Sequence, residues 1–276
     1  MTPELIPHLL MLAAMQGVSE LFPISSLGHS VLVPALLHWP LNRDAVWFLP
    51  FIVVLHLGTA TALGLYFWRD WWRLLSGFVR ARGRTSDPDA RLLWLLMIGT
   101  VPAGLIGLAL EHRIRDLFGG YTIVAVALIL NGGLLWLGDR FKHRVATADL
   151  HELSYARAFG VGVAQSLALI PGFSRSGATL VAGLAAGLDY AASARFSFLL
   201  ATPIIAAAGV LEVPKLIKAG AALPLGWMFT AGAIAGICAW LSTAFLMRWF
   251  GGHEVKALRP FAIYCAVLGV LALVVG

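Results

Sequence analysis

The chain has 276 residues, of which 59% are hydrophobic and 12% are charged, and its mean hydropathy is +0.84. Soluble globular domains typically carry about a quarter of charged residues, so that class is excluded. The net charge of +6 is modest, and the position of the basic residues is more informative than their sum. We predict a polytopic membrane protein with a single integral membrane domain, residues 1–276.

The first apolar segment, residues 5–37, is interrupted near its middle. A spanning helix needs about 20 consecutive apolar residues, and neither half of the segment is that long. We therefore predict a re-entrant hairpin, whose irregular backbone must be satisfied by protein or by a water-filled cavity. The interrupting residues are polar or break helices: Gln16, Glu20, Pro23, Ser25, Ser26, Gly28 and His29.

A second interrupted segment, residues 156–188, contains the sequence PGFSRSGAT at 171–179. Its Pro-Gly pair ends any helix that arrives from the N-terminal side, because proline lacks an N–H and glycine favours turn dihedrals. We predict a second re-entrant hairpin here. Three longer apolar stretches follow each hairpin and are predicted to span the membrane: 47–68, 92–110 and 121–137, then 196–211, 225–249 and 260–275.

The two halves of the chain therefore share one plan, with a first repeat over about 1–145 and a second over about 150–276. The hairpin sequences LFPISSLGHSVLV and LIPGFSRSGATLV also resemble each other weakly. Because three spans per half is an odd number, the repeats must be inverted relative to each other. We predict an all-α protein of two inverted repeats, with a site where the broken helices meet.

The basic residues predict the orientation. If both hairpins re-enter, 14 of the 20 Lys and Arg residues fall on one side, including those of the 69–91 and 139–154 loops. If the second segment spanned the membrane instead, the division would be 12 against 7. The positive-inside rule favours the re-entrant arrangement and makes these two loops cytoplasmic.

The second hairpin places Arg175 among the hydroxyls of Ser174, Ser176 and Thr179. An unpaired charge at membrane depth is costly, by about 3 kcal/mol on insertion scales, so this cluster predicts an anionic ligand. The planar guanidinium of arginine is suited to phosphate oxygens. Freed backbone N–H groups at the start of a helix could bind the same anion.

The first hairpin offers complementary groups. Gln16 and Glu20 are four residues apart and share a helix face, and the hydroxyls of Ser25 and Ser26 and the imidazole of His29 follow. If the two hairpin tips meet, the combined set can carry out phosphoryl transfer. Arginine would neutralise the transferring group, serine or water would attack, histidine would move a proton, and the carboxylate would hold a divalent metal.

Two stretches of the chain resemble a known family. MQGVSELFPISSLGH resembles the (E/Q)GxTEFLPVSSxGH signature of the BacA-type undecaprenyl-pyrophosphate phosphatases, and PGFSRSGAT matches the second signature of that family. The basic loop after FWRD, the SFLLATP run and the RPFAIY stretch extend the resemblance over nearly the whole chain.

The resemblance implies hydrolysis of undecaprenyl (C55 polyprenyl) diphosphate to the monophosphate and inorganic phosphate. This reaction recycles the lipid carrier for peptidoglycan synthesis and gives bacitracin resistance. The resemblance also implies a place in the bacterial inner membrane with the active site toward the periplasmic face, and Mg²⁺ or Ca²⁺ as the cofactor. The expected partners are the polyprenyl diphosphate and the lipid bilayer, without nucleic acid, and a homodimer is left open.

The resemblance carries three sets of roles to this sequence. It implies catalytic roles for Glu20, Ser26, His29 and Arg175, and metal binding by Glu20 and Gln16. The implied phosphate-binding residues are Ser25, Gly172, Ser174, Arg175, Ser176 and Thr179.

Three positions depart from the family pattern. Gln16 stands where many relatives have Glu, Ser19 replaces Thr, and Leu21-Phe22 reverses the usual order. Glutamine can coordinate a metal through its carbonyl oxygen but brings no negative charge.

Several alternatives remain open from the sequence. The nucleophile is either Ser26 or a water activated by His29, and Glu20 binds the metal or acts as a base. Arg175 could pair with Glu20 for structure alone. His56 shows no ligand spacing, and we expect a packing or interface role for it. A transporter or flippase for polyprenyl phosphate or another anion is the alternative function, because inverted repeats with broken helices are also typical of transporters.

Overall fold

The computed structural model describes residues 5–42, 45, 47–110, 120–141, 149–218, 225–252 and 256–275, without the side chains of 215–218 and 225. Within these residues the chain is helical and contains no strand. Five helices are long and apolar enough to cross a membrane, which confirms the predicted all-α polytopic membrane protein. They are α3 (Phe48–Tyr66), α5 (Pro88–Ala109), α7 (Tyr121–Gly138), α10 (Tyr190–Lys218) and α11 (Leu225–Gly252).

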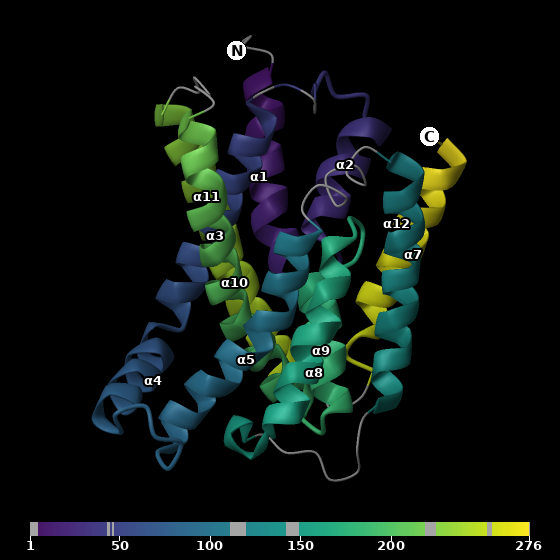
Figure 1. The fold of residues 1–276 in the computed structure, drawn as a ribbon. Helices are drawn as coiled ribbons and strands as arrows, with labels where there is room; N and C mark the ends of the chain where they lie inside the picture. The colour runs from purple at the N-terminus through teal and green to yellow at the C-terminus, as the bar shows by residue number, and fades with distance from the viewer. Residues whose placement is uncertain are drawn as a thin grey trace.

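The sixth predicted span is α12 (Arg259–Val275), an apolar helix of 17 residues that packs along α7. Five of the six helices begin and end within about four residues of the boundaries expected from the sequence, whereas α10 extends beyond the predicted 196–211 at both ends. Figure 1 shows them as a bundle in which α12 returns toward the end of the molecule that carries the N-terminus.

Both interrupted segments fold as pairs of short helices. The first pair is α1 (Leu5–Leu21) and α2 (Ser26–Leu36), and the second is α8 (Tyr155–Gln165), extended by a 3-10 turn at Ser166–Leu169, and α9 (Arg175–Ala185). Figure 1 shows that each pair turns back near the middle of the bundle. The two pairs enter from opposite ends of the bundle, as re-entrant hairpins do.

Helices of the first half of the chain pack on helices of the second half. Helix α1 packs on α11, and its counterpart α8 packs on α5. Helix α7 packs on its own counterpart α12, and α3 packs on its counterpart α10. A two-fold relation between the halves would produce these pairings, but the inverted repeat itself stays a prediction.

One helix was not expected. The 69–91 segment, predicted to be a basic loop, contains the amphipathic helix α4 (Trp68–Arg80), so the prediction of a loop is wrong for this part. A single residue, the buried Phe67, separates α4 from α3. Apolar residues at helical spacing explain the helix, because they give it a face that packs on α5.

The other predicted cytoplasmic loop is described only in part. Residues 139–141 form a 3-10 turn after α7, and Leu150–Glu152 form a second one before α8. Several of the basic residues counted for the orientation lie outside the described residues or lack described side chains: Arg43, Arg113, Arg115, Lys142, Arg144, Lys215 and Lys218. The orientation therefore stays a prediction.

Candidate active site

The tips of the two hairpins are built in the same way. Ser25 caps α2 by accepting a hydrogen bond from the Gly28 N–H at 3.1 Å, and Ser174 caps α9 by accepting one from the Gly177 N–H at 3.1 Å. Serine is a favoured N-cap because its oxygen satisfies an N–H that has no partner within the helix. Helices α2 and α9 thus both begin at the hairpin tips, and the N-terminus of a helix attracts anions.

The two tips contact each other through Asn131, a buried residue of α7. Its Nδ2 donates to the Pro23 carbonyl at 3.0 Å, and its Oδ1 accepts from the Ser174 N–H at 3.0 Å. Ser176 Oγ adds a hydrogen bond to the Phe22 carbonyl at 3.1 Å. The condition for a shared site, that the tips meet, is confirmed. Asn131 was missed, and its only signal is a single amide in an apolar span.

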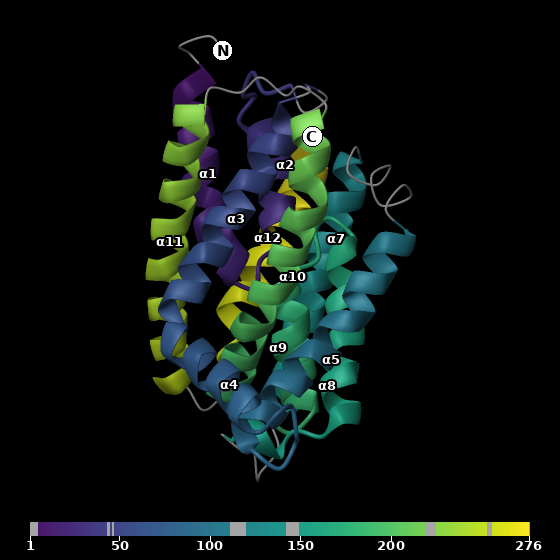
Figure 2. The same ribbon diagram turned by 60° about the vertical axis from the view of Figure 1, so that its left-hand side comes forward.

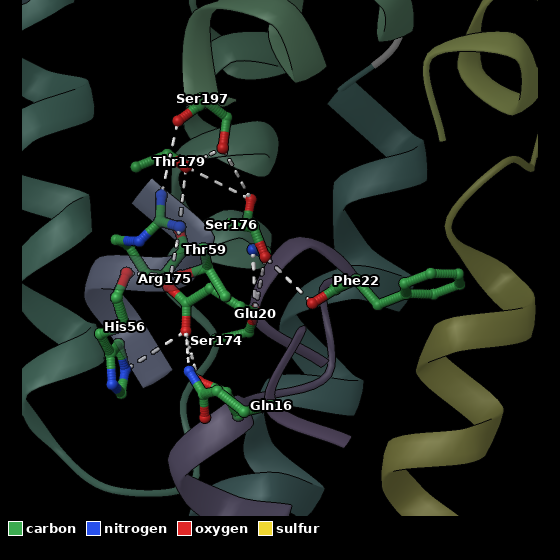
Figure 3. A network of polar contacts seen from close by, with 12 residues as sticks. Gln16, Glu20, Phe22, His56, Thr59, Ser174, Arg175, Ser176, Thr179 and Ser197 are labelled. Carbon is green, nitrogen blue, oxygen red and sulfur yellow. Dashed lines mark hydrogen bonds and ion pairs between the residues drawn. The ribbon is translucent and has the colours of Figure 1, made fainter. Parts of the chain in front are cut away.

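Glu20, near the C-terminal end of α1, lies at the centre of a buried polar cluster (Figure 3). Its Oε1 accepts a hydrogen bond from Arg175 Nη2 at 3.0 Å, and the two groups form an ion pair. Its Oε2 accepts from Ser26 Oγ at 2.6 Å and from Gln16 Nε2 at 3.0 Å. Four of the predicted residues therefore meet, from helices α1, α2 and α9.

His56 of α3 also belongs to this cluster, a position that the expected packing or interface role did not include. Its Nε2 lies 3.4 Å from Glu20 Oε2, and its Nδ1 lies 2.9 Å from the Ile52 carbonyl oxygen (Figure 3). Ile52 lies one helical turn before His56, and the contact with its carbonyl oxygen fixes the orientation of the imidazole ring. The sequence could not show this, because α3 reaches Glu20 only through tertiary packing.

His29, by contrast, faces another part of the protein. Its Nδ1 lies 2.7 Å from the Ser25 carbonyl oxygen, and its Nε2 lies 2.8 Å from the hydroxyl of Tyr264 on α12. The two rings are stacked, with centroids 5.6 Å apart. Among the contacts of the described residues, none joins His29 to Glu20 or Ser26. The expectation that this imidazole activates an attacking water has no contact to support it.

The hydroxyl groups around Arg175 make hydrogen bonds with other side chains and with backbone groups of the protein. Ser174 Oγ lies 3.0 Å from Ser176 Oγ, in addition to its capping bond. Thr179 Oγ1 donates to the Arg175 carbonyl at 2.8 Å and lies 2.6 Å from Ser197 Oγ. These side chains hold Arg175 and the start of α9 in place. Ser197, from α10, begins the SFLLATP run and was not predicted as a site residue.

Gly172 has a steric reason to be glycine. Its φ of 107° is unfavourable for residues with a side chain, and an added Cβ would lie 2.4 Å from the Val124 carbonyl oxygen. The second tip can therefore pack directly against α7. Its predicted role in binding phosphate stays a prediction.

Two buried polar atoms of the cluster have no hydrogen-bond partner: Arg175 Nε, a donor, and Gln16 Oε1, an acceptor. An unpaired buried donor and an unpaired buried acceptor are unusual, and they suit a phosphate oxygen and a cation respectively. Among the described residues, no three His, Cys, Asp or Glu side chains lie close enough together to hold a metal ion. A hard cation such as Mg²⁺ does not need one, because it is held by one or two carboxylates together with substrate phosphates.

These motifs and their arrangement agree with a family comparison. The family described as bacitracin resistance protein BacA matches residues 9–271, which include both hairpins and all six spans except the first residues of α1 and the last residues of α12. The chain belongs to the BacA family.

Curated relatives of this chain from several bacteria are named undecaprenyl-diphosphatase, in some cases with a number. It is 58% identical to undecaprenyl-diphosphatase 2 of Chromobacterium violaceum, with 96% of each chain covered. It is 50% identical to undecaprenyl-diphosphatase of Acidiphilium cryptum, with 95% of each covered. It is also 50% identical to undecaprenyl-diphosphatase of Granulibacter bethesdensis, with 95% of this chain and 94% of the relative covered.

Proposed function

We propose that this BacA protein hydrolyses undecaprenyl diphosphate to undecaprenyl monophosphate and inorganic phosphate, at the contact between its two hairpins. The single observation that carries the proposal is the buried cluster in which Glu20 joins Arg175 to the Ser26 hydroxyl. The chain covers 94% to 96% of the length of relatives that are named undecaprenyl-diphosphatase, and these names support the proposed substrate. The reaction would recycle the lipid carrier for peptidoglycan synthesis and would give resistance to bacitracin.

Arg175 is the proposed ligand of the terminal phosphate. It is held by Glu20 through Nη2, and its Nε is free to donate to a phosphate oxygen. The N-termini of α2 and α9 add the partial positive charge of their helix dipoles. Together they would stabilise the negative charge that the transferring group carries in the transition state.

Ser26 is the proposed nucleophile, and Glu20 is its proton acceptor. The 2.6 Å hydrogen bond from Ser26 Oγ to Glu20 Oε2 supports this assignment. The serine oxygen would form a bond to the terminal phosphorus while its proton passes to Glu20. The bond from phosphorus to the bridging oxygen would break, the lipid monophosphate would leave, and water would then hydrolyse the phosphoserine to inorganic phosphate.

A divalent cation, Mg²⁺ or Ca²⁺, would be held by Glu20 and by Gln16 Oε1, the acceptor without a partner. When bound, such an ion neutralises phosphate charge. His29 could not exchange a proton with Ser26 from its present position on Tyr264. Its catalytic role therefore stays a prediction that needs a movement of its ring.

The five apolar helices make the protein a multi-pass membrane protein. We propose the bacterial inner membrane as its location, with the site reached from the periplasmic side and the end that carries α4 in the cytoplasm. The excess of basic residues at that end supports this orientation. The homodimer stays a prediction.

The test is phosphate release from C55 or C15 polyprenyl diphosphate by detergent-purified protein, with and without EDTA. We expect metal-dependent release by the wild type and its loss in Arg175→Ala. Phosphate trapped covalently on the wild type but not on Ser26→Ala would identify the nucleophile, whereas substantial turnover by Ser26→Ala would mean that water attacks directly. A folded wild type that moves the lipid between leaflets without releasing phosphate would establish the transporter instead.

A further inference from the structure

Helix α4 exposes a continuous apolar surface. Trp68, Trp72, Leu75 and Val79, which we call the α4 stripe, have exposed fractions of 57%, 71%, 51% and 74%. Their spacing of four, three and four residues places all of them on one side of a helix. Four large apolar side chains in one row are more than the scattered exposure that is normal for a protein surface. Figure 2 shows α4 at one end of the bundle, outside the spanning helices.

The opposite face of α4 fixes the helix to the bundle. Leu74 and Gly77 are buried, and a Cβ on Gly77 would lie 2.8 Å from Asp89 Cβ, so α4 and α5 are in close contact. Asp70 forms an ion pair with Arg195 of α10, and Arg73 Nε lies 3.0 Å from Asp89 Oδ1. The helix therefore cannot rotate to bury the α4 stripe against the bundle.

Arginines flank the α4 stripe on one side. Arg69, Arg73 and Arg80 lie about 100° to 140° around the helix from Trp68, at 100° per residue, and are exposed. The guanidinium of Arg69 lies 5.4 Å from the centre of the Trp68 ring. Arg82 and Arg84 follow in the exposed turn after the helix. The side chains thus change from apolar to basic across the exposed surface of α4.

The charge of this segment is unbalanced. Residues 68–91 contain six arginines and three aspartates. The aspartates are only partly exposed and are held by arginines: Asp70 by Arg195, Asp89 by Arg73, and Asp87 by Arg80 at 3.2 Å. Arg69, Arg82 and Arg84 have no acidic partner among the described residues. An anionic surface would complement them.

We propose that α4 is an interfacial helix that binds the anionic phospholipid surface of the leaflet at its end of the bundle. The α4 stripe would enter the boundary between headgroups and acyl chains, and the arginines would contact phosphate headgroups, as interfacial helices do. The bilayer surface is within reach, because α4 starts one residue after the spanning helix α3. Tryptophan is also enriched at this depth. This inference does not depend on the proposed reaction.

The position of the α4 stripe can be measured with nitroxide labels in lipid nanodiscs. The label is placed at Val79→Cys in a Cys238→Ala background, where the remaining Cys265 is buried. The matched control is Ser86→Cys, in the exposed turn. We expect the label at 79 to be more accessible to oxygen than to a water-soluble nickel complex, and the label at 86 to show the reverse. A label at 79 that the nickel complex reaches as easily as the label at 86 would overturn the proposal.

The same label tests whether a second copy covers the surface. Spin-spin broadening at 79 would disappear on dilution with unlabelled protein if two copies met at this surface. That result would show that a dimer contact, and not lipid, covers the α4 stripe. An unbroadened spectrum with high oxygen access would support the lipid.

The headgroup preference is a separate measurement. Spin-labelled phosphatidylglycerol should associate with the wild type more strongly than spin-labelled phosphatidylcholine. The triple variant Arg69→Gln, Arg82→Gln, Arg84→Gln should lower this ratio several-fold, because each arginine near an anionic surface contributes about a fivefold preference at most. Arg140→Gln, an exposed arginine in the 3-10 turn after α7, is the control outside α4 and should lower the ratio less than the triple variant does. An unchanged ratio in the triple variant would refute the charge contact.

Discussion

The contact between His56 and Glu20 gives the sharpest test of the site, because the sequence indicated only a packing or interface role for that histidine. We expect His56→Ala to lower kcat for phosphate release about tenfold. The carboxylate of Glu20 has Arg175, Ser26, Gln16 and His56 around it, and the variant removes one of these four. Glu20 would then be less firmly fixed as the acceptor of the Ser26 proton.

The magnitude follows from the distance. A hydrogen bond to a charged group contributes about 1.5–3 kcal/mol. The 3.4 Å contact between His56 Nε2 and Glu20 Oε2 is longer than a normal hydrogen bond, so its contribution is at most the lower end of this range. About 1.4 kcal/mol corresponds to a factor of ten in rate.

The assay is steady-state phosphate release at saturating lipid diphosphate, together with the Tm of each variant in the same detergent. His56→Gln, which keeps an amide donor, is the matched control and should retain most of the wild-type kcat. His56→Ala within twofold of wild type would refute the positioning role. Equal losses in the alanine and glutamine variants, with an unchanged Tm, would also contradict it, because a donated hydrogen bond would then be irrelevant.

Three further predictions address the rest of the site. Arg175→Lys should lose roughly two orders of magnitude in kcat, since a point charge cannot hold Glu20 and a phosphate together; near-native turnover would remove the arginine from phosphate binding. Glu20→Gln should abolish activity or its metal requirement, and an unchanged response to EDTA would place the metal elsewhere. Gly172→Ala should lower Tm by several degrees, because backbone strain of about 1–3 kcal/mol adds to the clash with Val124. Gly160→Ala, with open space around its Cβ position, is the control, and equal Tm values would contradict the packing described.

The sequence by itself determined the class of protein, the two interrupted segments and the approximate positions of the spans. These are local properties: proline and polar residues within an apolar run forbid a continuous spanning helix, wherever the rest of the chain lies. The cost of a charge at membrane depth also predicted an anionic ligand for Arg175, with pairing to Glu20 as the structural alternative. The structure shows the pairing, with Arg175 Nη2 at 3.0 Å from Glu20 Oε1, and the ligand stays a prediction.

The contributions of α3, α7 and α10 to the site could not be predicted from local patterns. His56, Asn131 and Ser197 lie in apolar helices, and periodicity does not tell which helix packs against which. His29 was assigned to the centre because it follows Ser26 by one helical turn, yet its ring turns to Tyr264. Helix α4 lies in the connection between two predicted spans, which we expected to be a basic loop. Only the packing of α3, α7 and α10 around the hairpins decides these positions, because side chains distant in sequence become neighbours when the helices bury their apolar faces together.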